Sequence, residues 1–438
     1  MSASRGWWGS SIMALASAEA AAQGSPPVAS ASALQGAASG FQAGDTAWML
    51  MATVLVTLMV VPGIAVFYAG LVRRKNALST VALVLGSAAV VTLAWFSAGY
   101  SLAFTSGNGV FGGLSDLLLG QASVGTGRAH PLAPTVPEPV FVLFQLAFAM
   151  VTVALIFGAV VERMRFGAAM AFAALWTLLV YAPVAHWVWH PDGWLHTFGH
   201  LDFAGGTVVH LSSGVAGLVL AGMVGPRQGY GHEPMPPHNL MLTTLGAGFL
   251  WVGWFGFNGG SAMAAGFDAT RAVLVTQAAA AAGVIGWWLL EWMSRGQPSL
   301  LGLASGLVAG LIAITPASGY VGVGPALAIG LAGSAGCWFA ATWLKQKLGY
   351  DDSLDVFGLH GVAGFAGTVL TGLFASQVVN PMAQVGIQTF GALVVAAYVA
   401  AATALIAVVL RAIIGLRVKP EAEREGLDIA QHGESLDT

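Results

Sequence analysis

Residues 202–210 read Asp202-Phe203-Ala204-Gly205-Gly206-Thr207-Val208-Val209-His210, and a second stretch, Asp355-Val356-Phe357-Gly358-Leu359-His360, resembles them. Both begin with an aspartate, have a phenylalanine within two residues and end in a histidine. The sequence Gly-Val-Ala-Gly follows each histidine closely, at 214–217 and at 361–364. An ionisable side chain deep in a membrane span is costly and therefore marks a candidate functional site. We interpret the stretches as one element used twice and expect His210 and His360 to face one another in a pore.

The composition is that of a polytopic membrane protein. Of the 438 residues, 57% are hydrophobic and only 8% are charged, and the mean hydropathy is +0.77. These values lie far outside the range of soluble domains. The net charge of -3 carries little information, because the placement of Lys and Arg matters more than their sum. The single cysteine, Cys337, provides neither a disulfide framework nor a thiolate metal site.

The N-terminal segment differs in composition from the rest of the chain. Arg5 precedes a modestly apolar stretch with small residues near its end, and a Ser/Pro/Ala/Gly-rich stretch follows. This pattern predicts a signal peptide over 1–22 and a flexible extracytoplasmic linker over 23–45. The alternative interpretation is a disordered extracytoplasmic tail.

Apolar runs recur from Thr46 onward, each about long enough to cross a hydrocarbon core of about 30 Å. The predicted fold class is an all-α membrane protein with eleven transmembrane helices over 46–416. A charged C-terminal tail follows over 417–438. The predicted spans are 46–70, 78–104, 138–161, 167–189, 204–224, 239–262, 271–293, 299–315, 323–344, 357–375 and 386–416.

Basic residues predict the orientation of these spans. If the first span runs inward, only Arg5, Arg128 and Arg271 lie outside. By the positive-inside rule, the N-terminus is therefore outside and the C-terminus cytoplasmic. The basic residues at cytoplasmic ends are then Arg73, Arg74, Lys75, Arg163, Arg165, Arg227, Arg295, Lys345, Lys347, Arg411, Arg417, Lys419 and Arg424.

The two histidine stretches fall in the fifth and tenth spans, which run in opposite directions in this topology. Two sets of five spans with inverted orientation, followed by a long final helix, match a transporter plan with its site near the midplane. At 1.5 Å per residue, His210 lies about 12 Å from Asp202, and His360 about 7.5 Å from Asp355. The histidines meet only if both helices begin below the membrane surface. We therefore expect Asp202 and Asp355 to lie inside vestibules.

Aromatic residues and a serine gather near the expected outer ends of several spans. Aromatic faces attract cations, and a serine hydroxyl adds a hydrogen-bond acceptor, so the group could hold a small cation at the pore mouth. An interfacial aromatic belt is the alternative interpretation for any single member. The residues are Phe144, Phe148, Trp189, Trp254, Phe257 and Ser261.

A bare cation in an apolar pore meets a Born cost on the order of tens of kcal/mol, whereas a neutral molecule loses hydrogen bonds costing roughly a few kcal/mol. This difference predicts that whatever passes His210 and His360 does so deprotonated. Imidazole can accept and return a proton, so two neighbouring rings can relay one. A single buried histidine is more often a packing residue, but the repeated context favours a pore role.

Asp202 precedes a helical run and has two compatible interpretations, an N-cap and a fixed negative charge near the pore mouth. Asp355 has the same two at the cytoplasmic end. His186 and His190 have the i, i+4 spacing of a helical metal site, but no carboxylate or thiolate completes the set convincingly. Loop and interface histidines are the preferred interpretation, and we expect no metal.

Other function classes lack their motifs. No phosphate-binding Gly-rich loop followed by Lys-Ser/Thr occurs in the sequence, so ATP-driven transport by this chain is unsupported. No basic domain with interleaved aromatics occurs either, so nucleic acid is not an expected partner.

The chain resembles the ammonium transporters of the Amt/MEP type, relatives of the Rh proteins, over essentially all residues from Thr46 onward. The resemblance rests on residues 67–73, which read Phe-Tyr-Ala-Gly-Leu-Val-Arg, and on 202–210, 254–262 and 355–361. It implies transport of ammonium or ammonia across the cytoplasmic membrane by a non-enzyme without a cofactor.

The resemblance also implies roles in the pore. His210 and His360 resemble the twin pore histidines of the family. Phe148 and Phe257 resemble the stacked phenylalanines that gate the outer pore, and Trp254 a residue that lines the conduction path.

At the outer vestibule, Trp189 and Ser261 resemble the residues that recruit the cation, with Phe144 beside them. Asp202 resembles an aspartate needed near that site. Relatives often have a glycine run where this chain has 190–194, so the shape of the vestibule is open.

The resemblance further implies a homotrimer with one pore per subunit and a cytoplasmic PII-type regulatory protein as a partner. The tail resembles the family's tail, which couples neighbouring subunits. Three rival interpretations are an ammonium sensor that signals through this tail, a membrane metalloenzyme using His186 and His190, and a Rh-like gas channel for carbon dioxide. The cation-recruiting tryptophan and serine disfavour the gas channel.

Overall fold

The computed structural model describes residues 40–122 and 127–436. Within them the protein is helical, and eleven apolar helical segments are long enough to cross a membrane, which confirms the predicted fold class. The predicted signal peptide and most of the linker lie outside the described residues. The segments are Ala43–Leu71, Arg74–Phe104, Glu138–Phe157, Phe166–Thr197, Gly206–Val224, Leu240–Gly260, Phe267–Arg295, Leu300–Ala317, Val323–Leu348, Phe357–Phe374 and Pro381–Ile413.

Several segments contain a π-helical turn (η) between α-helical parts. The elements of the first five segments are α3 (Ala43–Leu58), η1 (Met59–Ile64), α4 (Ala65–Leu71), the 3₁₀ turn η2 (Arg74–Asn76), α5 (Ala77–Ala94), η3 (Trp95–Gly99), α6 (Tyr100–Phe104), α7 (Glu138–Phe157), α8 (Phe166–Trp176), η5 (Thr177–Tyr181), α9 (Ala182–Trp189), α10 (Trp194–Thr197), η6 (Gly206–Leu211) and α11 (Ser212–Val224). Those of the remaining segments are α12 (Leu240–Gly260), α13 (Phe267–Arg295), α14 (Leu300–Ile314), the 3₁₀ turn η7 (Thr315–Ala317), α15 (Val323–Phe339), η8 (Ala340–Leu344), α16 (Lys345–Leu348), η9 (Phe357–Gly361), α17 (Val362–Phe374) and α18 (Pro381–Ile413).

Side-chain caps fix the beginnings of three of these helices. Asn239 accepts a hydrogen bond from the Leu242 N–H at 3.1 Å, and Ser299 accepts one from the Gly302 N–H at 2.9 Å. Asn380 does the same for α18, where a proline occupies the first helical position. Caps of this kind satisfy backbone donors that a helix leaves open at its start.

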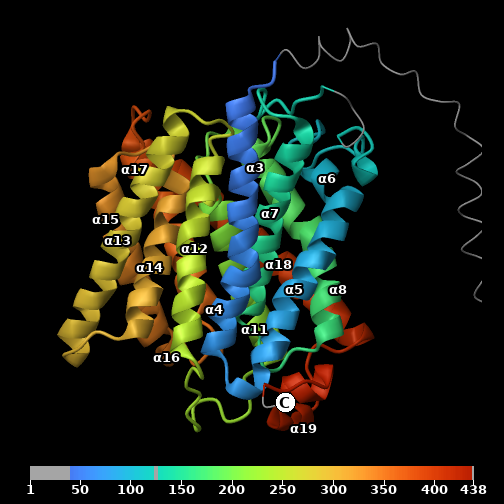
Figure 1. Ribbon diagram of the computed structural model, residues 1–438, viewed down its shortest axis with the longest axis vertical. Coiled ribbons are helices and arrows are strands. Elements are labelled where there is room, and N and C mark those ends of the chain that lie inside the picture. The colour runs from blue at the N-terminus through green and yellow to red at the C-terminus, as the bar shows by residue number, and fades with distance from the viewer. Residues whose placement is uncertain (1–39, 123–126, 437–438) are drawn as a thin grey trace, which may run out of the picture.

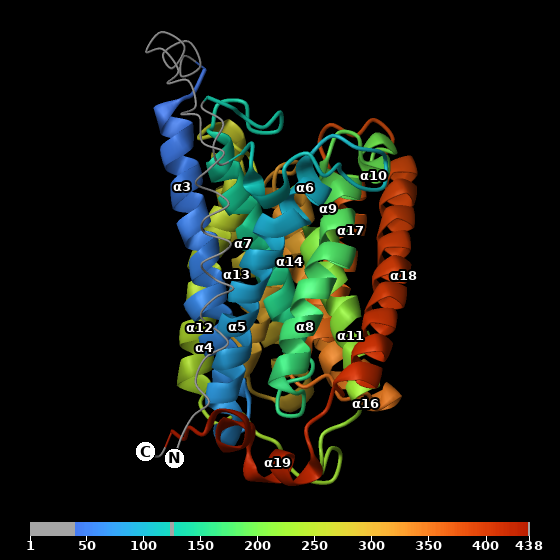
Figure 2. The same cartoon turned by 90° about the vertical axis from the view of Figure 1, so that its right-hand side faces the viewer.

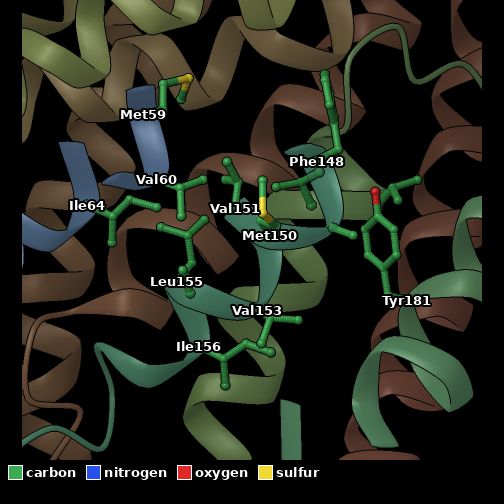
Figure 3. Close-up of a cluster of buried hydrophobic side chains, with 14 of the residues drawn as sticks. Met59, Val60, Ile64, Phe148, Met150, Val151, Val153, Leu155, Ile156 and Tyr181 are labelled. Carbon is green, nitrogen blue, oxygen red and sulfur yellow. The ribbon is translucent and has the colours of Figure 1, made fainter. Parts of the chain in front are cut away.

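Helix α7 lies at the centre of the bundle, and 94% of its most apolar 18-residue stretch is buried. Figure 3 shows its side chains, among them Phe148, Val151 and Leu155, between Met59 and Ile64 on one side and Tyr181 on the other. Helix α18 lies at one edge of the bundle (Figure 2), and only 33% of its most apolar 18-residue stretch is buried. Side chains on every face of α7 therefore lie in the interior of the protein.

The connecting loops gather at the two ends of the helical bundle (Figure 1). We call the face where α3 begins the vestibule face; it carries 105–122, 127–137 and 261–266. The opposite face, with 158–165, 225–239 and 414–436, is the tail face. There α19 (Pro420–Glu425) and η10 (Asp428–His432) lie across the end of the bundle (Figure 2). The Asp428 carboxylate accepts from the N–H groups of Leu78 and Ser79, at 3.1 and 2.7 Å, and so docks the tail on α5 of the same chain.

A buried ionic cluster joins separate loops of the tail face. Glu162 accepts from the backbone N–H and the guanidinium of Arg73, at 2.7 and 2.9 Å, and its Oε2 lies 3.3 Å from Arg227. Arg227 also pairs with Asp351 at 2.8 Å. Burial alone would raise the pKa of Glu162, but Arg227 and Arg73 outweigh it and hold that pKa below its usual value.

The two histidine elements cross one another. Helix α17 packs against η6, and α11 packs against η9. Gly214 and Gly364, each four residues after its histidine, lie at the crossing. A Cβ on Gly214 would overlap the Gly361 backbone, and one on Gly364 would lie 2.7 Å from the Leu211 nitrogen. Only glycine allows the backbones to approach this closely. The first glycine of 214–217 and the last glycine of 361–364 therefore have the same role, although they differ in position within the Gly-Val-Ala-Gly sequence.

Candidate functional site

The structure brings His210 and His360 together in the interior of the bundle. Their Nδ1 atoms lie 3.2 Å apart, and the rings stack at 5.3 Å with 25° between their planes. Both side chains are buried, with 0% and 5% of their surface exposed. The two histidines therefore face one another inside the bundle.

A continuous line of aromatic rings leads from the vestibule face to this pair. Trp189 meets Phe148 edge-on at 5.9 Å, and Phe148 stacks on Phe257 at 4.1 Å. Phe257 lies 5.8 Å from the ring of His210. Trp254 stacks on His210 at 5.3 Å and donates its indole N–H to the Thr315 hydroxyl at 2.8 Å.

The line begins in a cavity of about 480 Å³ on the vestibule face, which we call the vestibule. Four of the five residues predicted to bind the substrate line it. The fifth, Phe144, is fully buried and packs against Phe148 at 4.8 Å, and it is not among the lining residues. The lining residues are Leu132, Gln145, Phe148, Val188, Trp189, His196, Gly199, His200, Leu201, Asp202, Phe203, Ser261, Ala262, Met263, Asp268 and Tyr320.

The sequence analysis missed Gln145, His200, Met263 and Tyr320 as lining residues. For Gln145 a signal was present, because it lies three residues before Phe148 and therefore on the same face of α7. No comparable signal marks the other three residues. They come from separate segments, and only the fold brings them to the vestibule.

Asp202 caps the helix that carries His210. Its Oδ1 accepts from the N–H groups of Gly205 and Gly206 at 2.8 and 2.7 Å, and its Oδ2 from Thr207 and Val208 at 2.8 and 3.1 Å. Burial raises the pKa of Asp202, and these four N–H groups act against the rise. Both carboxylate oxygens are thus used by the backbone, as the cap interpretation requires.

The counterpart of Asp202 is Asp352, and the equivalence expected for Asp355 was wrong. Asp352 precedes His360 by eight residues, as Asp202 precedes His210. Its Oδ2 accepts from the Phe357 N–H at 2.7 Å at the start of η9. Asp355 resembles Asp202 in the sequence because each lies within two residues of a phenylalanine, whereas the spacing to the histidine, which decides the equivalence, selects Asp352.

Asp355 occupies the position that corresponds to Gly205. Both residues have a positive φ, 57° and 108°, because the chain turns sharply into the helix at that point. The Asp355 side chain does not cap the helix; it pairs with Lys345 at 2.7 Å. It lines a cavity of about 190 Å³ on the tail side, as a vestibule residue was expected to.

The space beside the paired histidines is narrow. A cavity of about 10 Å³ touches His210, His360 and Trp254. This volume is close to the lower limit for a single water molecule. The other residues that line it are Met59, Ile64, Phe67, Tyr68, Val151, Leu155, Leu250 and Val308.

His186 and His190 stack on one another at 4.6 Å, but their nitrogens have other partners. The two ring nitrogens of His186 lie 2.9 and 2.7 Å from the carbonyls of Ala103 and Asn108, and His190 Nδ1 accepts from the Asp192 N–H. In the part of the chain that the structure describes, no group of three or more His, Cys, Asp or Glu could hold a metal ion. The metalloenzyme hypothesis therefore has no site in this region.

Comparison with known proteins gives a consistent result. The profile described as the Ammonium Transporter Family matches residues 47–436. An ammonium transporter of Bacillus subtilis is 45% identical over 403 residues, which cover 90% of this chain and 98% of the relative. The crystal structure of Saccharomyces cerevisiae Mep2 superposes with a TM-score of 0.81 at 37% identity, covering 88% of this chain and 89% of that one. A sensor Amt protein superposes with a TM-score of 0.83 at 31% identity, covering 89% and 98%. On this evidence the chain belongs to the ammonium transporter family.

Proposed function

We propose that the protein transports ammonium across the cytoplasmic membrane, recruiting it as a cation at the vestibule and conducting it as ammonia past His210 and His360. The observation that carries this proposal is the line of rings from Trp189 through Phe148 and Phe257 to the histidine pair. Aromatic faces attract a small cation, most strongly where water is excluded.

Ammonium gives up its proton to solvent water in the vestibule, before the phenylalanine stack, and its nitrogen goes on as ammonia. Beyond Phe257 the path is apolar and narrow, and two neutral imidazoles cannot offset a Born cost on the order of tens of kcal/mol. Asp202 is not the proton acceptor in this scheme, because its oxygens are used by four backbone N–H groups. It holds the helix start and places a negative charge near the vestibule.

The proton follows separately through the histidine pair. An Nδ1 to Nδ1 distance of 3.2 Å supports a hydrogen bond in which one ring donates and the other accepts. A proton that passes along this bond moves charge past the histidines, while no cation enters the apolar path. The two rings then return to their starting protonation states.

We further propose that the vestibule face is extracytoplasmic and that the tail face is cytoplasmic, with the basic loops inside. We infer a homotrimer with one pore per subunit and a PII-type regulator at the tail face, both from the family resemblance. The sensor alternative is disfavoured, because the relative from Bacillus subtilis at 45% identity is a transporter.

The deciding experiment is a current measurement on proteoliposomes after an ammonium concentration jump, without a proton gradient. A saturable current is expected, because net charge crosses with each turnover. Internal alkalinisation without current would mean that ammonia alone passes and would overturn the proton relay. Absence of both signals, with ammonium still bound by the purified protein, would favour the sensor alternative.

A further inference from the structure

Gln145 is a polar side chain of the vestibule whose hydrogen-bonding capacity is unused. It lies on α7 three residues before Phe148, lines the vestibule and is only 4% exposed. Its Oε1 has no hydrogen-bond partner. Among residues 40–122 and 127–436 its carboxamide forms no hydrogen bond at all.

A buried amide in this state is costly, since each unmet polar group loses its water without replacement. The amide borders a cavity of about 480 Å³, from which a partner can come. A molecule that enters the vestibule is therefore the expected partner of this amide.

Asp202 and Ser261, two other polar residues of the vestibule, already form hydrogen bonds within the protein. Asp202 accepts from four backbone N–H groups. Ser261 donates its hydroxyl to the Phe257 carbonyl at 2.9 Å and keeps only lone pairs for a ligand. His200 contacts the Thr207 hydroxyl through Nε2 at 3.0 Å; its Nδ1 has no hydrogen-bond partner, but it faces the backbone of Gly391 on α18.

We propose that Gln145 is a specificity-determining residue of the vestibule, whose side-chain carbonyl accepts a hydrogen bond from ammonium. This inference rests on the proposed function. Aromatic faces such as those of Phe148 and Trp189 attract any cation of suitable size, because the attraction is electrostatic. A carbonyl oxygen accepts hydrogen bonds only from donors such as N–H groups, so Gln145 makes the site prefer cations that carry N–H groups.

The test compares two cations that differ in N–H donors. Ammonium has four N–H groups, whereas tetramethylammonium has none and depends on the aromatic faces alone. In Gln145→Met, which keeps the length of the side chain, the ammonium concentration for half-maximal flux should rise about tenfold, corresponding to about 1.4 kcal/mol. Inhibition of that flux by tetramethylammonium should keep its wild-type concentration dependence.

The matched control is Gln277→Met. Gln277 is exposed on α13, and its Oε1 accepts from the Trp251 indole at 3.1 Å, away from the vestibule. This variant should match the wild type in both measurements. An unchanged half-saturating concentration in Gln145→Met would overturn the proposal, and so would an equal loss of ammonium flux and tetramethylammonium inhibition.

A second variant keeps the proposal testable if Gln145→Met does not fold. Gln145→Glu retains an acceptor and adds charge, so ammonium should reach half-saturation at a lower concentration than in the wild type. A rise of tenfold in this variant would contradict the assigned role. Failure of the proposed function is recognised separately, since wild-type proteoliposomes would then show no ammonium flux.

Discussion

The Nδ1 atoms of His210 and His360 lie 3.2 Å apart, so the two rings can share one proton only if one donates and the other accepts. Each histidine comes from a different half of the chain. Because both rings are buried, water cannot replace a missing partner without entering an apolar path.

Replacing both histidines with alanine should abolish the ammonium-dependent current, since no titratable group then bridges the apolar path. The measurement is the proteoliposome current after an ammonium jump, with equal protein insertion checked by quantifying the reconstituted chain. A current of wild-type size in the double variant would refute the relay.

Replacing Phe257 with alanine should open the path between the vestibule and the histidines, because its ring stacks on Phe148 at 4.1 Å. We expect loss of selectivity, measured as potassium flux in proteoliposomes that the wild type excludes. Phe172→Ala is the control: it also removes a buried ring, next to Phe157 at 6.2 Å, and costs a similar 3–5 kcal/mol or so of stability. If both variants leak equally, the leak reflects loosened packing and not a gate.

Arg227→Met should strongly destabilise the protein, by about 3–5 kcal/mol, because it leaves Glu162 and Asp351 buried without their shared partner. Thermal unfolding in detergent measures the effect. Arg295→Met supplies the comparison, since Arg295 is 55% exposed and lies 3.4 Å from Glu291. Its loss should cost about 1 kcal/mol or less. Similar unfolding temperatures for the two variants would contradict the importance of the cluster.

Asp352 should make stability depend on pH. Burial raises the pKa of Asp352 to about 6, with Lys345 acting against the rise and Asp355 adding to it. The folded state therefore holds this proton more tightly than the unfolded chain. The resulting stabilisation is fully present below about pH 4 and is lost as the pH rises through 6, on the order of 3 kcal/mol in total.

Asp352→Asn tests this dependence. Its amide oxygen can still accept from the Phe357 N–H, but the group no longer titrates. The unfolding temperature of the wild type should fall more steeply between about pH 4 and 6 than that of the variant, with other titrating groups cancelling in the comparison. Parallel curves would show that Asp352 does not titrate in this range.

The spans and the histidine pair could be predicted because their signals are local. Hydropathy over about 20 residues marks each helix, and two histidines in matching contexts stand out against an apolar background. The identity of the second capping aspartate could not be predicted in this way. Asp352 and Asp355 both precede η9, and the folded backbone decides between them: Asp355 has a positive φ and pairs with Lys345, whereas Asp352 accepts from the Phe357 N–H.

The vestibule was predicted only in part for a related reason. Phe148, Trp189, Asp202 and Ser261 have recognisable chemistry for a cation, and the structure brings them to one cavity. Gln145 has an ordinary side chain whose significance lies in what it does not contact. That information depends on how α7 packs against every neighbouring segment, which no single stretch of sequence contains.

The crossing of Gly214 against Gly361, and of Gly364 against Leu211, has a consequence for biogenesis. His210 and His360 are separated by 150 residues, so the first is synthesised well before the second. At about 5–20 residues per second, the ribosome needs roughly 8–30 seconds to supply the partner. During that interval the first five helices reside in the bilayer with an unpaired histidine and an open glycine surface. The conduction path is thus assembled by the insertion of the second half, and a chain arrested before it would have no pore at all.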